Sequence, residues 1–147
     1  MIITFCGHSD FIWTKEYEEK IFELFDKIIG NSAAELYFGG YGGFDSFVFE
    51  CGRKYKQTHP CITLVFITPY ILNNTEKVSV YDSVIYPSLE NVLPRYAILR
   101  RNQWMAEKAD FVIAYVTHSW GGAYQTYKHA MRKCKRIFNI AKDEENK

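Results

Sequence analysis

The sequence predicts an α/β fold with a parallel sheet of about five strands and helices on both faces. Short apolar runs alternate along the chain with segments of helical periodicity. The runs are continuously apolar rather than alternating, which is typical of strands covered on both faces. The chain has 147 residues, and a domain commonly takes about 100–200. One domain of this class is therefore expected.

The first half of the chain supplies three strands and two helices. A strand over 2–6 ends at a glycine, and a helix follows over 14–29, with an apolar stripe that begins at Tyr17 and with Thr14 as N-cap. A second strand over 35–38 leads into a glycine-rich stretch and a helix over 46–55. The third strand, 61–68, ends at Pro69.

The second half opens with a less regular segment. Residues 70–95 are expected to form an irregular excursion over the edge of the sheet. A helix over 96–109, a fourth strand over 110–116, a helix that begins at Gly121-Gly122, and a last strand over 136–140 complete the alternation. We expect one domain over 1–141 and a charged tail over 142–147.

Composition excludes several classes of protein. The 18 Lys and Arg residues balance 17 Asp and Glu residues, which disfavours a general nucleic-acid binder, so no nucleic-acid partner is expected. No apolar run approaches the ~20 residues of a membrane span, and no signal peptide is visible. Four cysteines without metal-ligand spacing indicate reduced thiols. A cytoplasmic protein with no membrane partner, no metal and no cofactor is expected.

Glycine turns follow three of the predicted strands. Because carboxyl ends of parallel strands share one edge of the sheet, these turns are expected to meet at a binding crevice. Glycines let backbone amides approach an anion, and the next helix N-terminus adds a positive dipole. A phosphate-bearing ligand is the functional interpretation, and three tight turns without ligand are the alternative. The candidate residues in these turns are Gly7, His8, Ser9, Gly39, Gly40, Tyr41, Gly42, Gly43, Phe44, Asp45, His118, Trp120, Gly121, Gly122, Ala123 and Tyr124.

Side chains near these turns suggest further contacts. Arg101 can bridge a phosphate and Asn102 can bind a base or ribose edge, unless both lie on a solvated basic face. Asp45 either accepts ribose hydroxyls or caps the helix after it. Rings among the glycines can sandwich a base or pack in the core. The chain lacks a G-x-x-x-x-G-K-[ST] loop and a G-x-G-x-x-G turn after its first strand, which disfavours P-loop hydrolases and ordinary dehydrogenases.

Five ordered motifs together resemble the SLOG superfamily. This Rossmann-like group contains the DNA-processing protein DprA and the Lonely Guy phosphoribohydrolases, and the resemblance is strongest to its small YpsA-like branch. The resemblance implies a Rossmann-like sheet and a nucleotide-derived ligand between the glycine loops. It also implies a sensor that detects or sequesters an ADP-ribose-type or cyclic nucleotide signal, as in phage defence. The motifs are Phe5 to Ser9, Gly39 to Asp45, Arg101 to Met105, Ala109 to Tyr115 and Gly121 to Thr126.

Departures from the family bear on activity. Lonely Guy enzymes carry a catalytic glutamate in their second glycine loop, and the matching stretch Gly121 to Lys128 has no acid. Ser9 also replaces an arginine of the first turn. We therefore predict binding without catalysis. One alternative is a nucleotide hydrolase that uses the carboxylates of Asp45 and Asp82, with His8 and His118 as acid and base.

A second alternative is an oligomeric adaptor without ligand. The 70–95 excursion is rich in tyrosine, which is enriched at interfaces. Tyr81, Tyr86 and the following Tyr96 are the candidate interface residues. A homo-oligomer is expected on this ground.

Overall fold

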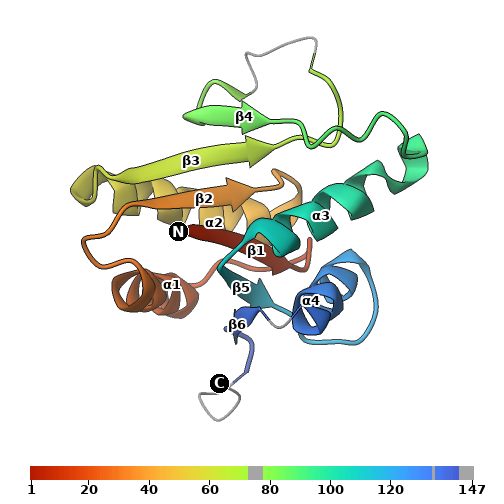
Figure 1. Ribbon diagram of the computed structural model, residues 1–147. Helices are drawn as coiled ribbons and strands as arrows, with labels where there is room; N and C mark the ends of the chain where they lie inside the picture. The colour runs from red at the N-terminus through yellow and green to blue at the C-terminus, as the bar shows by residue number, and fades with distance from the viewer. Residues whose placement is uncertain (73–77, 134, 143–147) are drawn as a thin grey trace.

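The computed structural model describes residues 1–72, 78–133 and 135–142. Its six strands form one sheet of order β4-β3-β2-β1-β5-β6, and every neighbouring pair is parallel. The predicted fold class is therefore confirmed (Figure 1). The strands are β1 (Ile2–Gly7), β2 (Ala34–Phe38), β3 (Ile62–Ile67), β4 (Ser83–Ile85), β5 (Phe111–Tyr115) and β6 (Arg136–Asn139).

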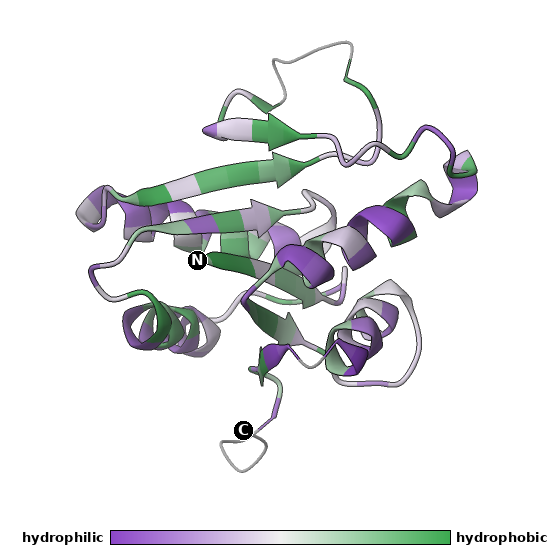
Figure 2. Cartoon of the chain, viewed as in Figure 1, coloured by the Kyte–Doolittle hydropathy of each residue, from purple (hydrophilic) through white to green (hydrophobic). Residues whose placement is uncertain are grey.

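Helices cover both faces of this sheet. On one face lie α1 (Lys15–Ile28) and α2 (Gly42–Thr58), and on the other lie α3 (Ala97–Lys108) and α4 (Gly122–Arg132) (Figure 1). A 3-10 turn, η2 (Pro94–Tyr96), leads into α3. Figure 2 shows that apolar residues fill the central strands, while polar residues gather on the outer sides of the helices. Burial of apolar surface on both faces of the sheet is the main source of stability in such a fold.

The two faces bury different kinds of side chain. Under α1 and α2 the core is aromatic, and the Phe5 ring stacks on Phe38 at 5.2 Å while its edge meets Phe25. Under α4 the core is built of small residues such as Ala114 and Ala130. Small side chains let α4 approach the sheet closely, which brings its first turn near the end of β1.

The helix that follows β2 begins earlier than the sequence predicts. It was expected from Ser46 but begins at Gly42, so Phe44 lies in its first turn and is 0% exposed. The prediction of a ligand-facing Phe44 is therefore corrected: its ring packs edge-on against Phe11 at 5.3 Å. By contrast, the N-cap of α1 is as predicted, with Thr14 Oγ1 accepting from the Tyr17 amide at 3.2 Å.

The 70–95 excursion contains a strand that the sequence did not predict. β4 pairs with β3 and makes a sixth strand at the sheet edge. Its position is fixed by Asp82, whose carboxylate accepts from the Leu64 amide at 2.7 Å and from Lys56 Nζ at 2.6 Å. The neighbouring Tyr81 ring stacks on Phe66 at 5.2 Å. Residues 73–77 and, beyond Lys142, the predicted tail lie outside the described residues.

Within the described part of the chain, no helix combines the length and apolar character that crossing a membrane requires.

Candidate ligand-binding site

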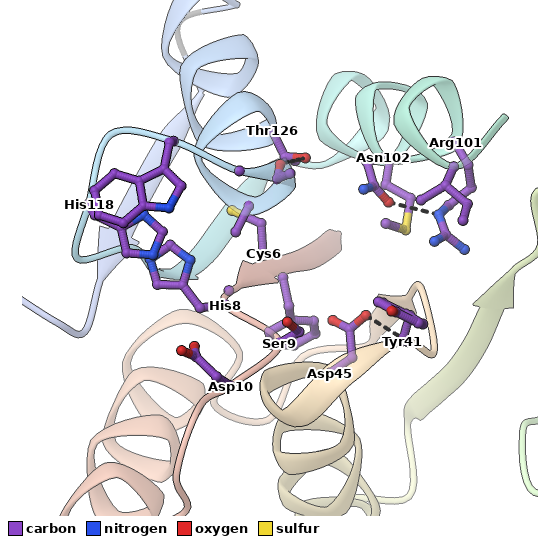
Figure 3. Close-up of a pocket in the computed structure, with 18 residues that line it drawn as sticks. Cys6, His8, Ser9, Asp10, Tyr41, Asp45, Arg101, Asn102, His118 and Thr126 are labelled. Atoms are coloured by element: carbon purple, nitrogen blue, oxygen red, sulfur yellow. Dashed lines mark hydrogen bonds between the residues drawn. The ribbon is translucent and has the colours of Figure 1, made fainter. Parts of the chain in front are cut away.

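The chain changes direction across the sheet between β1 and β5. From β1 it moves outward through β2, β3 and β4, and it then returns to β5 on the other side of β1. Loops that leave such a switch point diverge and open a crevice at the carboxyl ends of the strands. A cavity of about 410 Å³ lies at this place, between the loop after β1 and the starts of α2, α3 and α4 (Figure 3).

The structure brings most of the sequence-predicted residues together in this cavity. Figure 3 shows His8 and His118 on one side and Arg101 and Asn102 on the other. The predicted residues that line it are Gly7, His8, Ser9, Tyr41, Asp45, Arg101, Asn102, His118, Trp120, Gly121, Gly122 and Ala123. Predicted residues outside the lining are Gly39, Gly40, Gly42, Gly43, Phe44 and Tyr124.

The first glycine cluster is used by the fold itself. A Cβ on Gly43 would lie 2.8 Å from the carbonyl oxygens of Ser9 and Phe11, and one on Gly42 would lie 2.9 Å from Ser9 Cα. The Gly43 amide donates to the Ser9 carbonyl at 2.8 Å. These glycines therefore let the loop after β1 rest on the start of α2. The expected phosphate contact through the Gly43 amide is corrected accordingly, because that amide already has a partner.

The second glycine pair is open. Gly121 has φ +89, which favours glycine, and a Cβ on either Gly121 or Gly122 would meet nothing within 4 Å. No side chain caps the N-terminus of α4 among the described residues. Because the first amides of a helix lack intrahelical partners and carry its positive dipole end, this terminus is suited to an anion. Gly121, Gly122 and Ala123 all line the cavity.

Arg101 ties three elements together beneath the cavity. It is 2% exposed, and its Nη1 donates to the carbonyl oxygens of Gly39 at 2.9 Å and Ile67 at 2.7 Å. Its Nε donates to Asn102 Oδ1 at 2.8 Å. Arg101 thus joins α3 to the ends of β2 and β3, and most of its donors are used in doing so. A Cβ built on Gly39 would lie 3.2 Å from Arg101 Nη2 and 3.3 Å from Asp45 Oδ2, so both side chains lie against the same side of Gly39.

Asp45 combines the capping role with a place in the cavity wall. Its Oδ2 accepts from the Tyr41 amide at 3.0 Å. Burial raises the pKa of Asp45 from 3.8 to about 6, although this hydrogen bond and the Arg101 charge act in the opposite direction. Burial also lowers the pKa of Arg101, and Asp45 opposes that shift. Asp45 therefore takes up a proton at a higher pH than an exposed aspartate does, while Arg101 keeps its charge.

Cysteine chemistry is disfavoured in this wall. Cys6 is buried, and burial followed by the Asp45 charge raises the pKa of its thiol to about 12. The thiolate is the reactive form. Cys6 therefore contributes a small apolar surface to the cavity.

A column of three rings forms the other wall. The rings of His8 and His118 stack with centroids 3.8 Å apart and an interplanar angle of 12°. The His118 ring stacks in turn on Trp120 at 3.7 Å and 19°. Trp120 is 67% exposed, so its outer face is available to a flat ligand. Tyr41, 72% exposed, stands at the rim.

The hydrolase alternative loses one of its two carboxylates. Asp82 does not line the cavity, because it is bound to Lys56 and to the Leu64 amide at the β3–β4 edge. Asp45 remains in the cavity with His8 and His118.

Comparison with known proteins gives a likeness of fold. No protein-family model matches the sequence, and no curated protein matches it. A solved structure of DNA processing protein A from Helicobacter pylori, reported in a study of its single-stranded DNA binding mode, superimposes with a TM-score of 0.64. The fold is similar to that of DNA processing protein A. The likeness covers 98% of this chain and 66% of that chain, at 15% sequence identity.

Six residues that line the cavity were missed by sequence reasoning, namely Phe5, Cys6, Asp10, Ile98, Met105 and Thr126. Ile98 and Met105 lie one turn to either side of Arg101 on α3, and Thr126 lies one turn after Gly122 on α4, with its Oγ1 donating to the Gly122 carbonyl at 3.0 Å. Helical spacing from the predicted residues is the signal that could have found them. Asp10 follows directly after the first motif, and Phe5 and Cys6 lie within it.

Proposed function

We propose that this protein binds a nucleotide or nucleotide-derived small molecule as a sensor or sequestering protein. The single observation that carries the proposal is the uncapped N-terminus of α4, which faces a cavity at the switch point of the sheet. The volume of about 410 Å³ lies within the range of roughly 300–1,000 Å³ for small-molecule sites.

Each part of the cavity has a role in the proposal. The amides of Gly122 and Ala123 bind phosphate with the aid of the α4 dipole. The outer face of Trp120 stacks on the base. Asn102, whose Oδ1 is held by Arg101 Nε, presents its amide nitrogen to the ribose or the base edge. Arg101 supplies positive potential from below rather than a full bidentate contact.

The ordered motifs favour the YpsA-like branch of the SLOG group and a signal of ADP-ribose or cyclic nucleotide type. The described part of α4 carries no carboxylate that faces the cavity, which favours binding over glycosidic hydrolysis.

A cytoplasmic location and a homo-oligomer that uses the exposed Tyr96 complete the proposal. Light scattering after size-exclusion chromatography tests the oligomer, and a monomer at every concentration would contradict it.

Calorimetric titration tests the binding proposal directly. The panel contains ADP-ribose, AMP, cyclic AMP and inorganic phosphate. A single-stranded oligonucleotide is added because the DprA structure comes from work on single-stranded DNA. Saturable binding of a mononucleotide or ADP-ribose is the expected result. Binding of the oligonucleotide alone would contradict the proposal.

A matched pair of variants locates the phosphate. Gly122→Asp places a carboxylate at the start of α4, where it stabilises the helix but repels a phosphate. Gly122→Asn has nearly the same shape without the charge, and the open space at Gly122 accepts both. We expect Gly122→Asp to weaken ligand binding at least about tenfold more than Gly122→Asn does. Equal affinity of the two variants would place the phosphate elsewhere.

A second candidate function is hydrolysis of the bound nucleotide. The observation that favours it is Asp45, a cavity carboxyl whose pKa is raised by burial to about 6, a value suited to proton transfer near neutral pH. Chromatography of AMP and NAD after incubation tests it. Products that form with the wild type and are absent with Asp45→Asn would support it.

A further inference from the structure

We propose that His8 is a positioning residue whose neutral imidazole holds the loop between β5 and α4 in its binding conformation, so that protonation of His8 releases this loop. The loop, residues 116–121, carries His118, Trp120 and the first residue of the open glycine pair. The consequence for ligand binding rests on the proposed function, whereas the loop movement does not.

The contact that carries the inference is a hydrogen bond between two loops. The Thr117 amide donates to His8 Nε2 at 2.9 Å. A ring nitrogen can accept only when it carries no proton, so the proton of the neutral ring must be on Nδ1. This bond fixes the tautomer of His8 and joins the end of β1 to the loop after β5.

Few other polar contacts hold the outer part of the loop. Val116, at its start, exchanges hydrogen bonds with the Asn139 side chain at 3.2 and 3.0 Å. His118 Nδ1 is buried without a hydrogen-bond partner among the described residues. The His118 ring is therefore held by stacking between His8 and Trp120. The position of the loop beyond Val116 depends on His8 through the Thr117 bond and through the ring column.

Protonation of His8 opposes both contacts. A proton on Nε2 would turn the acceptor into a donor that faces the Thr117 N–H, so the bond would be lost. It would also make the His8 ring positively charged, and the centroid of this ring lies 3.8 Å from that of the stacked His118 ring. Trp120 would then lose the support that aligns its ring with the cavity, whereas Gly121 stays bound to α4 through the Gln125 amide at 3.1 Å.

The surroundings of His8 keep it neutral at pH 7. Burial, followed by the neighbouring His118, lowers the pKa of His8 below 6.5, while Asp10 on its own loop acts in the opposite direction. On β5 the edge of the Tyr115 ring faces it at 6.0 Å. The other charged groups of the cavity wall are Asp45 on α2 and Arg101 on α3. The bond to Thr117 is therefore intact at neutral pH and lost as the pH falls through the pKa of His8, which lies below 6.5.

The first experiment follows the loop without any ligand. Proton–nitrogen NMR spectra of the full chain are recorded from pH 8 to pH 5, and the His8 ring, the Thr117 amide and the Trp120 indole are monitored. In the wild type we expect the Thr117 and Trp120 signals to shift with the same midpoint as the His8 ring. Signals that stay constant while His8 titrates would overturn the proposal.

Two substitutions of His8 distinguish its role as a hydrogen-bond acceptor from the effect of its positive charge. The side-chain oxygen of His8→Gln can accept from Thr117 but cannot titrate, whereas His8→Leu can do neither. We expect His8→Gln to keep the wild-type Thr117 signal of pH 8 at every pH, and His8→Leu to shift it at every pH. His59→Gln removes an imidazole that stacks on Tyr55, outside the cavity lining, and serves as the control with an unchanged pH response. A His8→Leu spectrum that matches the wild type would overturn the proposal.

The second experiment adds a ligand. ADP-ribose is used because each of its phosphates has one ester bond and shares the anhydride bond, so neither titrates near pH 6 as the phosphate of AMP does. We expect wild-type affinity to fall at least about tenfold between pH 7.5 and pH 5.0, and His8→Gln to show less than a threefold change. Equal pH dependence in the two proteins would overturn the role of His8. If ADP-ribose does not bind at either pH, the proposed function fails for this ligand, and the NMR result still decides the inference.

Discussion

Asp45 is a carboxyl group that the fold keeps partly out of water at the wall of its cavity. Between about pH 4 and 6 the unfolded chain has lost the Asp45 proton while the folded protein keeps it. The unfolded state then binds fewer protons, so this group lowers the free energy of unfolding as the pH rises through that window.

Replacement of Asp45 by asparagine removes this effect. Asn can still accept from the Tyr41 amide, and the charge is gone. We expect Asp45→Asn to raise the free energy of unfolding at pH 7.5 by about 1–3 kcal/mol, from roughly 1.4 kcal/mol per pKa unit, and to change it little at pH 4. Urea denaturation at the two pH values measures this. A variant less stable than the wild type at pH 7.5 would show that the Arg101 charge outweighs burial at this site.

Arg101 is the residue on which the cavity floor depends. In Arg101→Met the carbonyl groups of Gly39 and Ile67 lose their donor inside the protein. A buried carbonyl group left without a donor costs about 1–3 kcal/mol, so a large fall in the urea midpoint is expected. Arg100 is adjacent and exposed, and Arg100→Met is the control, expected to change stability by less than about 0.5 kcal/mol. Equal effects of the two substitutions would show that the hydrogen bonds of Arg101 to Gly39 and Ile67 do not stabilise the fold.

At the level of elements, the glycine pair Gly42-Gly43 is needed for packing, whereas the pair Gly121-Gly122 is not. Gly43, the second residue of α2, lies against the backbone of the loop after β1, whereas Gly122, the first residue of α4, lies in open space. Their sequences, Gly-Gly before a helix, are the same. The difference arises from a long-range contact, since Ser9 and Phe11 lie next to one pair and nothing lies next to the other.

The same substitution at these two positions should therefore have opposite effects. Gly43→Ala places a methyl group 2.8 Å from two backbone oxygens, and such overpacking costs about 1–3 kcal/mol. The methyl group of Gly122→Ala meets no atom, and alanine has a much higher helix propensity than glycine. We therefore expect the free energy of unfolding to rise by up to about 1 kcal/mol. Thermal unfolding followed by circular dichroism measures both. A Gly43→Ala protein as stable as the wild type would mean that the loop after β1 moves freely.

Local patterns predicted most of the elements, and long-range contacts explain the exceptions. The stripe that includes Tyr17 and Phe25 predicts α1, because amphipathic periodicity is a local property. β4 has three residues, and it is held by bonds from Asp82 to Lys56 and Leu64, which no local pattern reveals. The early start of α2 has the same origin, since glycine is a poor helix former and the Ser9 contact decides the outcome.

The candidate site was predictable to a similar degree. The topology rule places the ends of β1 and β5 together, so His8, His118 and Gly121 were expected in one cavity. The role of Arg101 in joining α3 to β2 and β3 was not predictable. It depends on the carbonyl groups of Gly39 and Ile67, which lie 62 and 34 residues away in sequence.

For the whole molecule, ligand binding should appear as added thermal stability. A ligand at a hundred times its Kd stabilises the folded state by about 2.7 kcal/mol. For a domain of this size that corresponds to a rise in Tm of roughly 5–10 °C. Differential scanning fluorimetry with ADP-ribose and cyclic AMP measures the shift. We expect Gly122→Asp to reduce the shift by about half or more, and a shift of equal size in that variant would mean that the ligand binds outside the cavity.

Because of the open space beside Gly122, the surface of the cavity can be changed at this position without a cost in folding stability. Other residues around the cavity, such as His8, Asp45 and Arg101, are committed to hydrogen bonds within the fold, so altering them disturbs folding. A side chain added at Gly122 would meet no atom within 4 Å and would leave the scaffold intact. This position offers evolution, or a protein engineer, a place to vary the surface of the cavity without first compensating for lost stability.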